Sequence, residues 1–246
     1  MQEDTEPALR AALRGLAYTG QTGDRVTQTQ LQYVLGGIYS KLGNYTQAVA
    51  VLRATLANGQ QLGNEHVVAS AMELLGNTYQ MLKEWPQARS WFQRAERLNR
   101  KLGDVRSATS NEIRIAELYE QQGNHQQSLA YGLQARALAR STKDLYNATS
   151  AELVLARAYL SSQHPDSAIY LARRSFNLGQ RNNENLRNAS SILALAYARL
   201  DSFKQAYHYQ SLWIGYQDSV SGAETQRKTG ALLYHYELDK KQSQIA

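Results

Sequence analysis

Cysteine is absent from this chain of 246 residues, and proline occurs only three times. Without cysteine the chain can form no disulfide, thiolate metal site or thiol nucleophile, and it suits either an oxidising compartment or the cytosol. Three prolines are too few to interrupt many helices, and Ala, Leu, Gln and Arg are frequent between them. These scarcities predict an all-α protein.

A long apolar run is also missing. No window approaches the roughly 18 to 20 consecutive apolar residues that cross a bilayer. The first residues, Met1–Pro7, are polar and acidic, unlike a signal peptide. We therefore expect the chain to be soluble, with membrane attachment only through a C-terminal segment that it does not include.

Residue patterns typical of catalysis are lacking as well. The five histidines never occur at the spacing of metal ligands, and no glycine-rich phosphate loop is present. Serine is common, but no nucleophile elbow surrounds one. The sequence therefore predicts no catalytic residue, no metal site, no cofactor and no enzymatic activity for this chain.

What the chain does contain is a repeat. Small residues lie three positions before and Ala or Ser nine positions after five tyrosines that recur about every 40 residues. The tyrosines are Tyr39, Tyr79, Tyr119, Tyr159 and Tyr197. Three registers that stay in phase over most of the chain predict a stacked array of helical hairpins.

The repeat also predicts how the chain is divided. Junctions such as Gly63-Asn64 and Gly103-Asp104 put glycine where a helix ends and a capping residue where the next begins. We expect a flanking helix in residues 1–23, five repeat units in 24–220 and an exit or capping helix in 221–246.

The pattern of a small residue, a tyrosine and then Ala or Ser resembles the tetratricopeptide repeat. The period is longer than the usual value of about 34 residues. Such lengthened repeats resemble those of peptide-sensing bacterial regulators, kinesin light chains and spindle-orientation adaptors, which bind protein or peptide segments. The resemblance implies a right-handed α-solenoid with a concave groove lined by the first helix of each hairpin.

The resemblance also indicates which residues face a protein or peptide ligand in that groove. They are Gln30, Tyr33, Glu73, Asn77, Arg114, Glu117, Glu120 and Arg157. Asn77 stands where the family often places an asparagine that bonds the ligand backbone. Of the positions that form a carboxylate clamp in co-chaperones, only Arg114 matches, so chaperone tails are not the expected ligand. A solvated groove without a specific ligand is the open alternative.

The formal net charge of +6 raises the question of nucleic acid. Many arginines, such as Arg97 and Arg140, fall on the second helix of a predicted hairpin, whereas glutamates such as Glu112 and Glu152 fall on the first. A surface that binds the phosphates of a nucleic acid would need a basic groove. Repeat proteins that recognise bases keep a fixed pair of side chains in each unit. We therefore expect no nucleic-acid partner.

The last part of the sequence departs from the repeat. Residues 224–245 are charged and carry Leu232, Leu233 and Tyr236 without the small residues of the units. The pattern reaches Ala246 without a stop signal, which predicts that the natural protein continues. We also expect self-association through the residues after Ser221, as in a parallel coiled coil.

Residues 236–246 resemble the exit helix of bacterial sensor proteins, in which such repeats precede a coiled coil, a membrane span and a histidine kinase or DNA-binding output. This resemblance implies a periplasmic or otherwise extracytoplasmic, ligand-sensing domain of a sensor histidine kinase in a two-component system. The alternative is a stand-alone scaffold or a peptide-regulated cytoplasmic adaptor.

Overall fold

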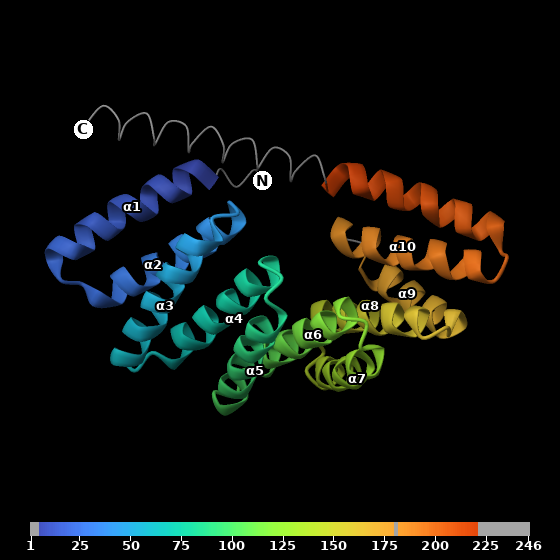
Figure 1. Ribbon diagram of the computed structural model, residues 1–246, viewed down its shortest axis with the longest axis horizontal. Coiled ribbons are helices and arrows are strands. Elements are labelled where there is room, and N and C mark those ends of the chain that lie inside the picture. The colour runs from blue at the N-terminus through green and yellow to red at the C-terminus, as the bar shows by residue number, and fades with distance from the viewer. Residues whose placement is uncertain (1–4, 180–181, 221–246) are drawn as a thin grey trace. The chain divides into compact units, whose positions relative to one another are not determined.

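The computed structural model describes residues 5–179 and 182–220, and all regular secondary structure in these residues is helical. Short turns separate the helices (Figure 1). The helices are α1 (Thr5–Thr22), α2 (Arg25–Lys41), α3 (Tyr45–Gln61), α4 (Glu65–Met81), α5 (Trp85–Lys101), α6 (Val105–Gln121), α7 (His125–Ser141), α8 (Leu145–Ser161), α9 (Pro165–Leu178) and α10 (Asn183–Arg199). Residues 203–220 are helical too. The predicted fold class, an all-α solenoid of helical hairpins, is confirmed.

The described residues fall into two compact units, whose boundary lies inside α5. We call residues 5–91 the N-terminal unit and residues 92–220, without 180–181, the C-terminal unit. Within each unit consecutive helices pack on each other, as α1 to α4 and α6 to α10 do. First helices of successive hairpins are also in contact: α2 with α4, α6 with α8, and α8 with α10. The predicted exit helix, residues 221–246, lies outside the described residues.

Small residues allow the helices of a hairpin to approach closely. Ala48, Ala88, Ser128 and Ala168, which lie nine positions after the repeat tyrosines, are completely buried. On the facing helix, a Cβ built on Gly36 would lie only 2.5 Å from Cδ2 of Leu52. A larger side chain at these positions would force the helices apart.

The turns between helices use the predicted local chemistry. Gly63 and Gly103 have φ values of +66° and +75°, and Asn64 and Asp104 accept hydrogen bonds from the backbone N–H of Val67 and Ser107. At these two junctions the glycine ends one helix through its positive φ, and the side chain of the following residue caps the next helix. These predictions from the glycine and cap positions are confirmed.

Lys143 occupies the turn position that glycine holds in other repeats, with a φ of +55°. Because a side chain is strained in this region, we expect Lys143→Gly to raise the free energy of unfolding by about 0.5–1 kcal/mol. The reciprocal variant, Gly123→Ala at a φ of +74°, should lower it by about 1 kcal/mol. Urea denaturation measures the change in the free energy of unfolding for each variant. Changes of the same sign in both variants would contradict the strain argument.

Candidate functional site

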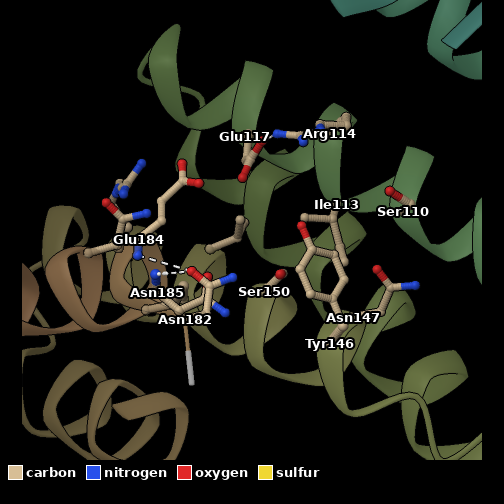
Figure 2. Close-up of a pocket in the computed structure, with 14 residues that line it drawn as sticks. Ser110, Ile113, Arg114, Glu117, Tyr146, Asn147, Ser150, Asn182, Glu184 and Asn185 are labelled. Atoms are coloured by element: carbon tan, nitrogen blue, oxygen red, sulfur yellow. Dashed lines mark hydrogen bonds and ion pairs between the residues drawn. The ribbon is translucent and has the colours of Figure 1, made fainter. Parts of the chain in front are cut away.

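A pocket in the C-terminal unit lies between the first helices of three successive hairpins, α6, α8 and α10 (Figure 2). Ser110 and Arg114 reach it from α6, Ser150 and Arg157 from α8, and Asn188 from α10. Its volume of about 90 Å³ is well below the roughly 300–1,000 Å³ of pockets that enclose small molecules. The space suits one side chain of a larger ligand.

Charged side chains of both signs line this pocket. Nη1 of Arg114 lies 3.0 Å from Oε2 of Glu117. The Glu117 carboxylate, with smaller effects of Tyr146 and Glu184, raises the pKa of Arg114 above its ordinary value, whereas burial acts in the opposite direction. Arg114 therefore stays charged and already has a partner.

Arg157 differs from Arg114 because none of the described residues pairs with it. Its side chain is exposed and makes no hydrogen bond or ion pair with any other residue in the described part of the chain. A guanidinium group carries five N–H donors and keeps its charge at any physiological pH. This residue therefore leaves donors free at the pocket.

Asparagines fix the shape of the pocket. Nδ2 of Asn147 donates to the Arg106 carbonyl at 2.9 Å and to Asp144 Oδ2 at 3.0 Å, so it ties α8 to the start of α6. Asn182 caps α10 by accepting from the N–H groups of Glu184 and Asn185. The side chains that shape the pocket walls are therefore held by hydrogen bonds within the protein.

The structure places three of the predicted groove residues, Arg114, Glu117 and Arg157, at this pocket. Glu120 is placed differently, because its side chain is only 6% exposed. Its carboxylate lies 2.8 Å from Nδ1 of His125 and accepts a hydrogen bond of 2.7 Å from the Ser161 hydroxyl. Glu120 thus joins the ends of α6 and α8 and does not line the pocket.

The other four predicted groove residues lie in the N-terminal unit, Gln30 and Tyr33 on α2 and Glu73 and Asn77 on α4. Gln30 is exposed and the other three are half-buried. Burial, and to a lesser degree the Glu73 carboxylate, raises the pKa of the Tyr33 hydroxyl. A groove that includes both units stays a prediction.

Sequence reasoning missed several residues of the pocket, although the repeat contained the signal for them. Ser110, Ser150 and Asn188 all lie nine positions before a repeat tyrosine. Gln30, which was predicted, holds the same position in the first unit. Applying that position to every repeat would have identified the three missed residues.

Residues 5–179 and 182–220 contain no group of three or more His, Asp or Glu side chains arranged to hold a metal ion. In the same residues, no helix combines the length and the apolar character that a bilayer crossing requires.

Comparison with known proteins agrees with the repeat architecture. Residues 27–101 match the tetratricopeptide repeat family. No curated protein is similar enough in sequence to count as a relative.

Solved structures of low sequence identity share the fold. BtubC from P. vanneervenii superposes with a TM-score of 0.73 at 16% identity, over 89% of this chain and 92% of that one. A Rap protein in complex with Competence and Sporulation Factor superposes with a TM-score of 0.65 at 14% identity. The match covers 89% of this chain and 62% of the Rap protein. A STAND protein with a tetratricopeptide repeat sensor, from Pyrococcus horikoshii, superposes with a TM-score of 0.65 at 14% identity. The match covers 95% of this chain and 41% of that protein. At these identities the likeness shows the fold alone.

Proposed function

We propose that the chain is a non-catalytic module that binds an extended segment of a protein or peptide at the pocket of the C-terminal unit. One observation carries this proposal. The pocket is formed by equivalent positions of three successive repeats, so its polar groups recur along the direction in which the hairpins stack. An extended chain presents its own polar groups at regular intervals and can match such a row.

Hydroxyl and amide groups suit the backbone of such a ligand. Ser110, Ser150 and Asn188 stand at one repeat position on three adjacent first helices. They can bond the ligand's N–H and C=O groups, while the charged residues select its side chains and set its register. The pocket volume of about 90 Å³ agrees with one inserted side chain.

The comparisons support this function without identifying the ligand. The Rap protein of similar fold was solved with Competence and Sporulation Factor bound. This chain spans only 62% of that protein, and residues outside the shared part can contribute to its binding. The ligand class therefore has to come from the pocket itself.

A variant that fills the pocket tests the proposal. Ser150→Trp should reduce binding of selected peptides at least tenfold, because the indole occupies the space of the ligand side chain. Ser167→Trp, at an exposed position of α9 outside the pocket, is the matched control. Peptides are selected from a random display library with the wild-type chain, and binding is measured by fluorescence anisotropy. If both variants bind them as the wild type does, the site lies elsewhere.

We further propose that this binding module senses the ligand for a bacterial sensor histidine kinase, with the chain on the extracytoplasmic side of the membrane. The resemblance of residues 236–246 to sensor exit helices supports this role, although they lie outside the described residues. The Pyrococcus protein also uses a repeat array of this fold as a sensor. The alternative, a scaffold or cytoplasmic adaptor, predicts no apolar span of about 20 residues in the gene beyond Ala246.

A further inference from the structure

The pocket has a specific chemical preference, if it binds a polypeptide segment as proposed above. We propose that it recognises a carboxylate of the ligand, an aspartate or glutamate side chain or a terminal carboxylate, through Arg157. This inference rests on the proposed function and adds the class of residue that the ligand must contain. It follows from the charges, the free donors and the size of the pocket.

The charges around the pocket leave one cation without a counterion. Arg114 is paired with Glu117 at 3.0 Å. The second glutamate, Glu184, lies 3.9 Å from Arg187 of the same helix. Arg157 has no such partner among the described residues, although it lines the same space. The positive charge that remains is therefore localised at Arg157, which attracts an anion from the ligand.

Uncharged donors line the same pocket as this cation. The hydroxyls of Ser110 and Ser150 make no hydrogen bond to other described residues. Oδ1 of Asn188 accepts from Nη2 of Arg187 at 3.2 Å, so its Nδ2 donors point elsewhere and have no partner in the described part of the chain. A carboxylate has two oxygens that accept several hydrogen bonds. A donor of this set that does not bond the ligand backbone can therefore bond the carboxylate when it is partly removed from water.

A carboxylate fits this arrangement better than a phosphate. A phosphoryl group carries close to two negative charges and three strong acceptor oxygens. The second arginine of the pocket, Arg114, is already committed to Glu117. One free guanidinium matches the single charge of a carboxylate and can bond both of its oxygens. The pocket volume of about 90 Å³ also favours the smaller group.

Among the five repeat units, only the fourth has a cation at the position of Arg157. Arg157 lies two positions before its repeat tyrosine. The equivalent residues of the other units are Gly37, Asn77, Glu117 and Leu195. None of them is a cation. A ligand that crosses several hairpins would therefore meet an unpaired positive charge at this position only in the fourth unit.

Peptide selection with matched variants tests the inference. Random peptides with free and with amidated C-termini are selected on the wild-type chain, on Arg157→Gln and on Arg157→Glu. Arg173→Gln, an exposed arginine of α9 outside the pocket, is the control for net charge. Thermal unfolding should be nearly unchanged in all variants, because Arg157 is exposed and unpaired.

We expect wild-type selection to enrich Asp or Glu at one peptide position. Arg157→Gln should bind such a peptide about tenfold more weakly, yet bind its Gln analogue as the wild type does. Arg157→Glu should prefer Lys or Arg at that position. If peptides are enriched only when their C-terminus is free, the group that Arg157 binds is the terminal carboxylate.

Two results would count against different claims. Selected peptides without an acidic preference whose binding Ser150→Trp still blocks would overturn the carboxylate assignment and leave the peptide-binding function intact. Peptides insensitive to Ser150→Trp would overturn the proposed function itself. An equal loss with Arg173→Gln and Arg157→Gln would show that net charge, and not the pocket, attracts the acidic peptides.

Discussion

Leu52→Ala is expected to lower the free energy of unfolding by about 2–5 kcal/mol. Leu52 is completely buried in α3, and its side chain fills the space above Gly36 where α2 approaches α3. Removing it leaves a cavity that two rigid helices cannot close, so both the transfer free energy and the packing contacts are lost. Denaturant unfolding of the chain measures the loss.

Gly36→Ala provides the second half of a double-mutant cycle. Its Cβ would lie 2.5 Å from Cδ2 and 2.6 Å from Cγ of Leu52, so the single variant should cost about 1–3 kcal/mol. In the double variant the new methyl group occupies part of the emptied space. The combined loss should therefore be clearly smaller than the sum of the two single losses.

Gly37→Ala is the matched control for this cycle. Its Cβ would lie 3.6 Å from Cδ1 of Leu74, which is an ordinary contact. Because alanine favours a helix over glycine, this variant should be neutral or more stable by up to about 1 kcal/mol. Additive losses for Gly36→Ala and Leu52→Ala would show that close helix approach is not what the small residue provides.

The fold could be predicted because the same residue types recur at the same positions in successive repeats. Three features recur in register with the tyrosines: a small residue where helices approach closely, a glycine with positive φ, and an Asn or Asp cap. Each depends on residues that are close in the sequence, so it can be recognised without knowing the rest of the structure. Lys143, which takes the glycine position with a φ of +55°, shows that the register persists even where the preferred residue is replaced.

The site was harder to predict because it depends on which polar groups already have partners. Position alone does not distinguish Glu120, which is held by His125 and Ser161, from Arg157, which has no partner among the described residues. Both lie on first helices near a repeat tyrosine. Only distances between side chains of different helices reveal the difference.

The outer arginines provide a second case that sequence reasoning interpreted incompletely. The sequence assigned them to second helices, but it did not show that several of them pair with buried glutamates of first helices, either in the next repeat or in their own. Arg100 contacts Glu112. One repeat later, Arg140 lies 3.7 Å and Arg174 3.1 Å from Oε1 of Glu152. The sequence shows the charges, whereas the burial of the glutamates depends on how the hairpins stack.

Loss of both arginines beside Glu152 should therefore destabilise the protein strongly. The Glu152 side chain is only 1% exposed, and no described residue forms a hydrogen bond with its Oε2. With Arg140→Ala and Arg174→Ala combined, the buried carboxylate loses its nearest counterions. We expect the free energy of unfolding at neutral pH to fall by about 3 kcal/mol.

The same variant should reveal its cause through pH. Burial raises the pKa of Glu152 above its ordinary value of 4.5, and the arginines partly offset this increase. A raised pKa means that the folded state binds more protons than the unfolded state between the two pKa values. The contribution of Glu152 to stability therefore falls as the pH rises through this window. Without the arginines the pKa should rise further and the fall should be steeper.

We accordingly expect the double arginine variant to approach the stability of the wild type as the pH is lowered through the raised pKa of Glu152, because the protonated carboxyl no longer needs counterions. Adding Glu152→Gln to the variant should restore most of the stability at neutral pH and remove the extra pH dependence. Urea unfolding at several pH values measures both effects. A stability difference that stays constant with pH would mean that the arginines act through the packing of their alkyl chains and not through the buried charge.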